Sequence, residues 1–396
     1  MLRVIIAGAG LGGLTAGLAL IRRGIQVRIL EQADVLREVG AGIQLSPNCN
    51  HVLYNLGLES EMLKVAAEPE GKIIRLWNTG QSWTLFDLGT VARELYGYPY
   101  FTMHRADLHS ILTNAVLQAD PQAITLGARL VGFEQWGDTV VARTADGRSF
   151  EGDVLVGADG VHSVVREQLF GTDKPRFSGL MCWRGVIDMD ALPERLRRPL
   201  GVNWVGPGAH VIHYPLRANR LMNFVTAVER SDWQLESWSQ QGTTEECLAD
   251  FVGWHEDVQT LIRAVKVPYK WALMVRDPLE QWGKGPVTLL GDAAHPTLPF
   301  LAQGAAMAVE DGYILARALA SVTSDPTDAL RRYEAARKDR TRRVVMGSNA
   351  NADRFHNRAL ASAEGATEYV DREWQPDRIK ERYEWLFTYD VDAVEV

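Results

Sequence analysis

The sequence contains little cysteine and no long apolar run. Its three cysteines, Cys49, Cys182 and Cys247, show neither metal-ligand nor CxxC spacing. A sparse, odd set of cysteines suits structural thiols in a reducing cytoplasm. No stretch reaches the roughly 20 apolar residues of a membrane helix. The first apolar run, RVIIA, breaks into glycines without the flanks of a signal peptide. We therefore expect a cytoplasmic protein without a membrane-spanning segment.

The chain also lacks an excess of positive charge. Lys and Arg number 42 against 50 Asp and Glu, a formal net charge of −8. This balance argues against nucleic acid or an anionic membrane as the main partner. The remaining composition, 46% apolar and 23% charged, is typical of a globular protein. At 396 residues the chain can form two or three domains with a sizeable core.

The first thirty residues predict a strand–helix–strand unit. RVIIAG reads as a buried parallel strand, LGGLTAGLALIRRG as a helix and IQVRILEQ as a second strand. Gly8, Gly10 and Gly13 lie between the first strand and the helix in GxGxxG spacing. Gly8 permits the tight turn, Gly10 lets a pyrophosphate approach the backbone, and Gly13 lets helix and strand pack closely.

An acidic residue completes this unit. Glu31 ends the second strand eighteen residues after Gly13 and is followed by Gln32. An acid at that place holds ribose hydroxyls and disfavours a 2′-phosphate, while the helix N-terminus attracts phosphate. The unit therefore predicts a dinucleotide site.

Two later apolar strands end in small residues and an aspartate. DVLVGADG contains Asp159, and VTLLGDAAHP contains Asp292 and Pro296. Asp292 can accept hydrogen bonds from sugar hydroxyls, and the small residues let a flat ring lie against the backbone. A helix beginning near Gly304 and Ala305 would direct its positive end at that ring.

The three motifs, in this order and at these separations, resemble the fingerprints of single-component flavoprotein aromatic hydroxylases. These are the para-hydroxybenzoate hydroxylase-like group A monooxygenases, and the resemblance runs over essentially the whole chain. It implies an α/β fold with a Rossmann-type FAD domain interleaved with an antiparallel-sheet substrate domain. It also implies flavin contacts from Arg105 and, through its backbone, from Leu130, and cofactor contacts from Gln32 and Asp159. The expected FAD-binding segments are 1–72, 98–176 and 274–345, the substrate-binding segments 73–97 and 177–273, and the C-terminal helical tail 346–396.

A narrower resemblance indicates the reaction. REVGAGIQLSPN, HRADLH, PLRANR and GDAAHPTLPFLAQGAAMAVED look like stretches of salicylate hydroxylases, 3-hydroxybenzoate 6-hydroxylases and 6-hydroxynicotinate 3-monooxygenases. The resemblance implies FAD as cofactor, with NADH or NADPH and O2 as co-substrates, and no metal. One oxygen atom would enter a small ring bearing a carboxylate and a hydroxyl, through a flavin hydroperoxide. The common assembly of the family is a homodimer.

The substrate site is expected on the strand within GPGAHVIHYPLR. Side chains alternate along a strand, so His210 and Tyr214 share one face while His213 lies on the other. The resemblance places His210 and Tyr214 beside the substrate, with His210 as the base for the phenol proton. The alternative is a structural role for His210. The resemblance also brings Gln44 close to flavin and substrate.

One departure from the family concerns the substrate itself. His295 and Pro296 are expected to flank the flavin, but Pro299 stands where the 3-hydroxybenzoate enzymes carry a glutamine that assists phenol deprotonation. Salicylate and 3-hydroxybenzoate are therefore equal candidates. The alternative functions are the same fold acting on a larger ring (a quinolone, kynurenine or polyketide) and a flavin-binding redox sensor. The basic segment 329–350 is interpreted as a helix with a solvated charged face.

Overall fold

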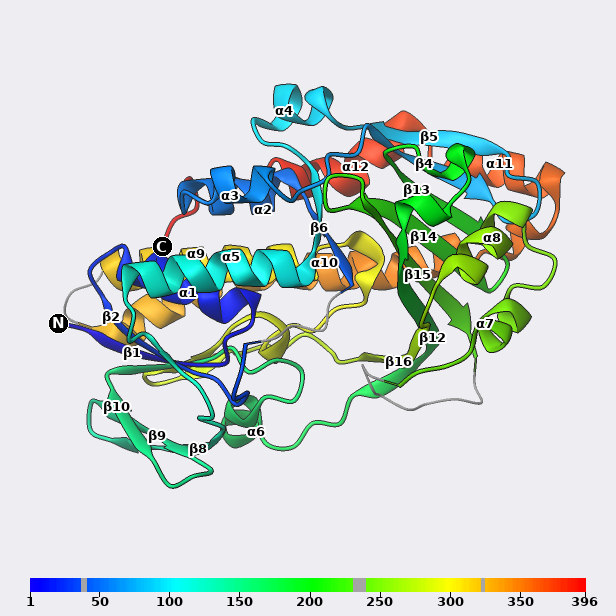
Figure 1. Cartoon of the computed structure of the whole chain (residues 1–396). Coiled ribbons are helices and arrows are strands. Elements are labelled where there is room, and N and C mark those ends of the chain that lie inside the picture. The colour runs from blue at the N-terminus through cyan, green and yellow to red at the C-terminus, as the bar shows by residue number, and fades with distance from the viewer. Residues whose placement is uncertain (37–40, 231–239, 322–324) are drawn as a thin grey trace.

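Two sheets organise the chain (Figure 1), and the computed structural model describes residues 1–36, 41–230, 240–321 and 325–396. The first sheet has six strands in the order β17-β18-β11-β1-β2-β7. All its pairs are parallel except the edge pair β17–β18, as expected for a Rossmann-type sheet. Its strands are β1 (Arg3–Ala7), β2 (Gln26–Leu30), β7 (Ile124–Thr125), β11 (Val154–Gly157), β17 (Gly283–Lys284) and β18 (Val287–Leu289).

Helices α1 (Leu11–Ile21), α5 (Arg105–Ala119) and α9 (Gly304–Ser321) cover one face of this sheet. Small residues let α1 and α9 approach closely, since a Cβ on Gly312 would lie 2.7 Å from the Ala16 nitrogen. The three-stranded sheet of β8 (Leu130–Trp136), β9 (Thr139–Thr144) and β10 (Ser149–Gly152) lies on the other side (Figure 1).

The second sheet has seven strands in the order β16-β12-β15-β14-β13-β4-β5. It is antiparallel, as predicted, except that β13 and β4 run parallel, because β4 comes from a separate early segment. The strands are β4 (Gly71–Leu76), β5 (Ser82–Asp87), β12 (Arg176–Asp188), β13 (Leu200–Gly206), β14 (Ala209–Leu216), β15 (Leu221–Glu229) and β16 (Tyr269–Val275).

Both faces of the second sheet are covered (Figure 1). One face packs on α7 (Thr244–Asp250) and α8 (Glu256–Ala264) around the buried Trp204. The opposite face packs on α10 (Pro326–Phe355), α11 (Ala363–Glu373) and α12 (Pro376–Phe387). The C-terminal segment is therefore docked against the sheet.

The remaining elements connect the two sheets. Strands β3 and β6 form a two-stranded antiparallel sheet, and β6 contacts β14, which brings Gln44 on β3 towards β14. The bounds are β3 (Gly42–Leu45), β6 (Phe101–His104), α2 (Pro47–Asn55), α3 (Glu59–Leu63), α4 (Thr90–Tyr96), α6 (Val164–Phe170), η1 (Met189–Ala191), η2 (Glu194–Leu196), η3 (Gly291–Ala293), η4 (Pro299–Leu301) and η5 (Arg358–Ala361).

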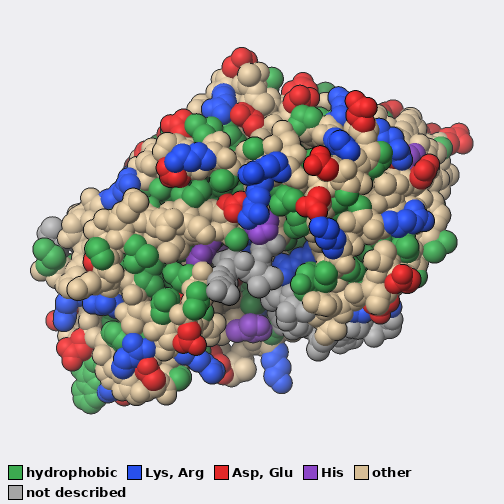
Figure 2. All heavy atoms as spheres, viewed as in Figure 1, with side chains coloured by type: hydrophobic (Ala, Val, Ile, Leu, Met, Phe, Trp, Pro, Cys, Tyr) green, Lys and Arg blue, Asp and Glu red, His purple; other side chains and the backbone are tan. Residues whose placement is uncertain are grey.

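Two sequence expectations concern surfaces and segments. Acidic and basic side chains are interspersed over the face seen in Figure 2, in keeping with the modest net charge. Within the described residues, no helix has the length and apolar character needed to cross a membrane. The expected start of the C-terminal tail at residue 346 falls inside α10, which continues unbroken to Phe355. The predicted domain bounds, this one included, stay predictions.

Candidate active site

The glycine-rich turn after β1 has the form that a dinucleotide pyrophosphate requires. Gly8 has φ +104°, and a Cβ there would lie 2.4 Å from the Ala158 carbonyl oxygen. A Cβ on Gly13 would lie 2.1 Å from the Gly8 oxygen, so the fold itself demands both glycines. Gly10 is different, since a Cβ there would meet nothing within 4 Å. The room beside Gly10, at the N-terminus of α1, fits a phosphate group.

Glu31 is fixed beside this turn. Its carboxylate accepts hydrogen bonds from the backbone N–H groups of Ala9 and Ala33, each 2.9 Å long. The next residue, Gln32, is exposed, and Leu130 is buried at the start of β8. Each carboxylate oxygen keeps a lone pair after these bonds, and the ribose contact predicted for Glu31 stays a prediction.

Helix α5 joins the same turn. His109 contacts the Ala9 carbonyl oxygen through Nε2 at 2.7 Å, which ties the helix to the glycine-rich turn. Arg105, the first residue of α5, donates its backbone N–H to the Ala41 carbonyl at 3.1 Å. The predicted flavin contact from Arg105 thus has a fixed backbone beneath it.

The second motif, which contains Asp159, is hydrogen-bonded through Arg166 to the third motif, which contains Asp292. Asp159 accepts hydrogen bonds from the Ser163 hydroxyl at 2.5 Å and from the Val164 N–H at 2.8 Å, which orders the start of α6. Burial raises the pKa of Asp159 despite these bonds. Arg166, buried in α6, donates to the carbonyl oxygens of Ala293 and Ala294 at 3.1 and 3.4 Å. The cofactor contact predicted for Asp159 remains a prediction.

The third motif presents one exposed carboxylate among buried neighbours. Gly291 has φ +63°, so the chain turns sharply at the end of β18 and leaves Asp292 exposed. His295 is buried, and its Nε2 lies 2.6 Å from Asp311 on α9. The ring of His295 therefore fastens the loop from inside, while the neighbouring Pro296 is half-buried.

A buried ion network supports this loop from behind. Arg337 of α10 is fully buried and contacts Asp311 at 2.7 Å and Glu310 at 2.6 Å. Asp311 also accepts the Gly291 N–H at 3.1 Å, and Arg340 pairs with Glu310 at 2.8 Å. The prediction of a wholly solvated face for the basic segment 329–350 is wrong at these two arginines, because their acidic partners lie on another helix.

Gln303, the residue before α9, is hydrogen-bonded to side chains at the start of α2. The Gln303 amide donates to Ser46 Oγ at 2.9 Å and accepts from Asn48 at 3.1 Å. Gln303 is buried, whereas Gly304 and Ala305 are half-buried. The first N–H groups of α9 are thus fixed at the place where the sequence predicted a flavin edge.

The substrate-side residues form a hydrogen-bonded row. Tyr100 donates to Gln44 Oε1 at 2.8 Å and accepts from Lys72 Nζ at 2.7 Å. Gln44 is also hydrogen-bonded to Tyr214, a bond that opposes the rise in the pKa of Tyr214 caused by burial. A Cβ on Gly42 would lie 2.7 Å from the Tyr214 ring, so β3 approaches this row closely.

The sequence missed Lys72 and Tyr100. Gly201 pairs with Lys72 across β13 and β4, and a Cβ on Gly201 would lie 3.1 Å from Lys72 Cγ. The absence of a side chain on Gly201 gives the lysine stem its room. Burial lowers the pKa of Lys72 to about 7. Within the described residues Lys72 makes no ion pair, so its charge has no acidic partner there.

The two histidines of β14 face opposite ways, as alternation predicted. His210 is buried on the face that carries Tyr214 and lies edge-on to Phe300 with ring centroids 5.0 Å apart. His213 accepts a hydrogen bond from the Trp204 indole at 3.3 Å on the other face. Burial lowers the pKa of His213 to about 3, which makes it a neutral structural residue. Pro299 is exposed at the start of η4.

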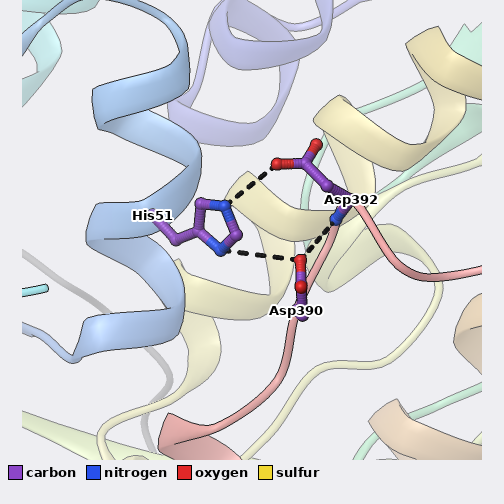
Figure 3. A group of neighbouring side chains, drawn as sticks. All are labelled: His51, Asp390 and Asp392. Atoms are coloured by element: carbon purple, nitrogen blue, oxygen red, sulfur yellow. Dashed lines mark hydrogen bonds and ion pairs between the residues drawn. The ribbon is translucent and has the colours of Figure 1, made fainter. Parts of the chain in front are cut away.

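A cluster of one histidine and two aspartates lies outside this site. His51 on α2 has Nε2 3.0 Å from Asp392 and Nδ1 3.9 Å from Asp390 (Figure 3). Asp392 also accepts from Asn55 at 2.7 Å and Tyr313 at 2.9 Å. With its oxygens used in this way, the group fastens the C-terminal segment to α2.

The nucleotide turn, the exposed Asp292 and the separate substrate sheet define a Rossmann-type flavoprotein whose residues fit FAD. The chain belongs to the family described as "FAD binding domain", whose model matches residues 1–348. It is 38% identical over 393 residues to a 3-amino-4-hydroxybenzoate 2-monooxygenase of Streptomyces platensis, covering 99% of this chain and 97% of that protein.

Two further similarities agree with this family. The chain is 37% identical over 395 residues to the 3-hydroxybenzoate 6-hydroxylase of Polaromonas naphthalenivorans, covering 98% and 96% of the two chains. A salicylate hydroxylase substrate complex shares its fold with a TM-score of 0.81 at 25% identity, covering 99% of this chain and 96% of that chain. The protein is therefore an FAD-dependent aromatic-ring monooxygenase, and the predicted para-hydroxybenzoate hydroxylase-like fold is confirmed.

Proposed function

We propose that the protein hydroxylates a small aromatic ring bearing both a carboxylate and a hydroxyl, of the salicylate or 3-hydroxybenzoate type. The observation that carries this proposal is Lys72, a half-buried ammonium at the end of the row Lys72–Tyr100–Gln44–Tyr214. The names of the relatives point to the same class, because they act on hydroxybenzoates or aminohydroxybenzoates.

The lysine matches a carboxylate in charge. A half-buried ammonium that has no acidic partner among the described residues is costly, and an anionic ligand reduces that cost. The Lys72 ammonium also lies 4.8 Å from the centroid of the Tyr100 ring, which holds the cation in place. A substrate carboxylate bound here would raise the pKa of Lys72 towards its ordinary value and anchor one end of the ring.

The other end of the ring would meet His210 and Tyr214. His210 is the base on this face, and burial lowers its pKa well below the ordinary value, which keeps it neutral and ready to take a phenol proton. Tyr214 and Gln44 orient the ring by hydrogen bonding. FAD, held by the turn at Gly10, Glu31 and Asp292, supplies the redox and oxygen-transfer chemistry when bound, with NADH or NADPH as reductant. We also propose that the protein is cytoplasmic and forms a homodimer.

A substrate panel tests the proposal. FAD-loaded protein is mixed with NADH or NADPH and with salicylate, 3- and 4-hydroxybenzoate, 3-amino-4-hydroxybenzoate or 6-hydroxynicotinate. NADH loss, O2 uptake and products are measured together. Catechol from salicylate or gentisate from 3-hydroxybenzoate would each identify the substrate. Turnover of larger rings alone, or of none, would contradict the proposal.

Substitution of Lys72 gives a sharper prediction. Lys72→Met removes a charge-assisted hydrogen bond worth about 1.5–3 kcal/mol, so KM for the carboxylate substrate should rise about 10- to 150-fold. Lys72→Arg, which keeps the charge, should lose less. The internal control is the same ring without its carboxylate, whose weak binding should change little. An equal loss for both ligands would show that Lys72 does not bind the carboxylate.

A further inference from the structure

His210 has a second histidine as its hydrogen-bond partner. Its Nδ1 lies 2.7 Å from Nε2 of His356, the residue that ends α10, and both rings are buried. Nδ1 of His356 lies 3.2 Å from a carboxylate oxygen of Glu229, at the end of β15. The Glu229 side chain is 60% exposed. A hydrogen-bonded chain therefore runs from the substrate face of the sheet to the surface through two buried imidazoles.

The chemistry of the three groups fixes the position of every proton. An ionised carboxylate can only accept a hydrogen bond, so Nδ1 of His356 carries the proton. A neutral His356 then offers a lone pair at Nε2, and Nδ1 of His210 must donate to it. It follows that Nε2 of His210 is unprotonated. In the described part of the chain this Nε2 has no hydrogen-bond partner.

The surroundings keep both histidines neutral. Burial is the largest influence on each, and it lowers the pKa of His210 and of His356. Two acidic groups act on His356 in the opposite direction, Glu229 through its hydrogen bond and Asp353 of α10 through space. The rings of Phe300 and Phe355 pack on His210 with centroids 5.0 and 5.2 Å away and bring no charge.

We propose that His210, His356 and Glu229 form a proton relay that carries the substrate phenol proton to solvent, with His356 setting the tautomer of His210. The phenol O–H bond breaks and an N–H bond forms at Nε2 of His210. The proton on its Nδ1 passes to Nε2 of His356, and the proton on Nδ1 of His356 passes to Glu229. Glu229 then releases one proton to water, which leaves a phenolate in the site, no charge on either ring and the ring proton of each histidine on Nε2. Protonation of the phenolate product along the same path in reverse returns both protons to Nδ1.

The relay explains how a buried base can take the phenol proton without becoming charged. A lone buried histidine that takes a proton becomes a buried cation, which is costly. With the relay, both rings stay neutral, and only the exposed Glu229 gains and loses charge. His356 and Glu229 do not touch the ring of the substrate in this scheme, so they are positioning residues. The relay rests on the proposed function, because it needs a phenol beside His210.

The tautomer can be tested without cofactor or substrate. Histidine is labelled with ¹⁵N, and long-range ¹H–¹⁵N correlations distinguish protonated from unprotonated ring nitrogens. Signals are assigned by their loss in His210→Gln and His356→Gln. The relay predicts protonated Nδ1 and bare Nε2 on both residues near pH 7. A protonated Nε2 on His210 would overturn it whatever the enzyme's substrate.

Proton release tests the path itself. FAD-loaded protein is mixed rapidly with 3-hydroxy-4-nitrobenzoate in weak buffer containing a pH indicator, and probe ionisation is followed by its colour. Glu229→Ala should slow proton release about tenfold or more, an effect within the range of general acid–base catalysis. Glu229→Asp, or added formate, should restore it. Glu229 is exposed, so its substitution leaves the core intact.

Asp353→Ala is the matched control, since Asp353 is an exposed acid near His356 that forms no hydrogen bond with it. It should leave the rate within about twofold, because removing a solvated charge has little effect. Equal rates in wild type and Glu229→Ala would overturn the relay while the proposed function stands. Failure of the wild-type protein to bind or ionise the probe would overturn both.

Discussion

Replacing Arg337 by methionine would remove the central cation of the buried ion network that supports the loop 291–296. The Arg337 side chain is fully buried and contacts Glu310 at 2.6 Å and Asp311 at 2.7 Å. Glu310 keeps Arg340, whereas Asp311 keeps, among the described residues, only His295 and a backbone N–H. Breaking a buried pair in this way costs about 3–5 kcal/mol, because a charge is left uncompensated.

The expected shift in melting temperature follows from the size of the chain. Unfolding entropy is about 2.1 cal/mol/K per residue, or about 0.8 kcal/mol/K for 396 residues that unfold together. A loss of 4 kcal/mol then lowers Tm by about 5 °C. FAD affinity should fall as well, because Asp311 holds both Gly291 and His295 in the loop that carries Asp292.

Circular dichroism would give Tm, and recovery of flavin fluorescence would give the Kd for FAD. Arg332→Met is the matched control, since Arg332 lies on the same helix, has a side chain that is 52% exposed and pairs with Asp328 four residues earlier. It should lower stability by no more than about 1 kcal/mol. If the two variants melted within about 1 °C of each other, the network would not carry the energy assigned to it here.

Two further predictions concern the same half of the molecule. Gly10→Ala should leave the Tm of the FAD-free protein nearly unchanged, because a Cβ on Gly10 meets no protein atom within 4 Å. The same Cβ would fill the space proposed for the pyrophosphate, so a titration should show FAD binding weakened about 100-fold or more. Gly13→Ala should lower the Tm of the protein itself, because a Cβ there would lie 2.1 Å from the Gly8 oxygen. Burial raises the pKa values of Glu310 and Asp311, yet nearby cations outweigh it and hold both below their ordinary values. Their stabilisation is full above about pH 4.5 and is lost below it. Tm should therefore fall more steeply from pH 5 to 3 in wild type than in Arg337→Met, and parallel curves would contradict this.

Local spacing made half of the site predictable. The positions of Gly8, Gly10, Gly13 and Glu31 follow from the fixed periods of a strand and a helix that are adjacent in sequence. The pairing of His210 with Tyr214 follows from alternation along one strand. In each case the residues lie within one element or within one strand–helix–strand unit, so the sequence pattern is sufficient to place them.

The missed residues act across long sequence separations. Lys72 reaches the row only because β4 returns to pair in parallel with β13. His356 follows His210 by 146 residues and meets it only when α10 docks on the sheet. Arg337 looked solvated because its partners lie on α9. One signal was available: Glu310 and Asp311 stand together in an otherwise apolar stretch, which indicates buried cations opposite them.

Arg337 lies within helix α10, and His356 is the residue directly after the helix, nineteen residues further along the chain. At 1.5 Å per residue this is a span of about 28 Å. Deleting a single residue between them would turn His356 by about 100° and draw it in by about 1.5 Å relative to Arg337. Either the ion network or the histidine pair would then lose its register. This segment should therefore tolerate exchange of its exposed side chains but not a change in its length.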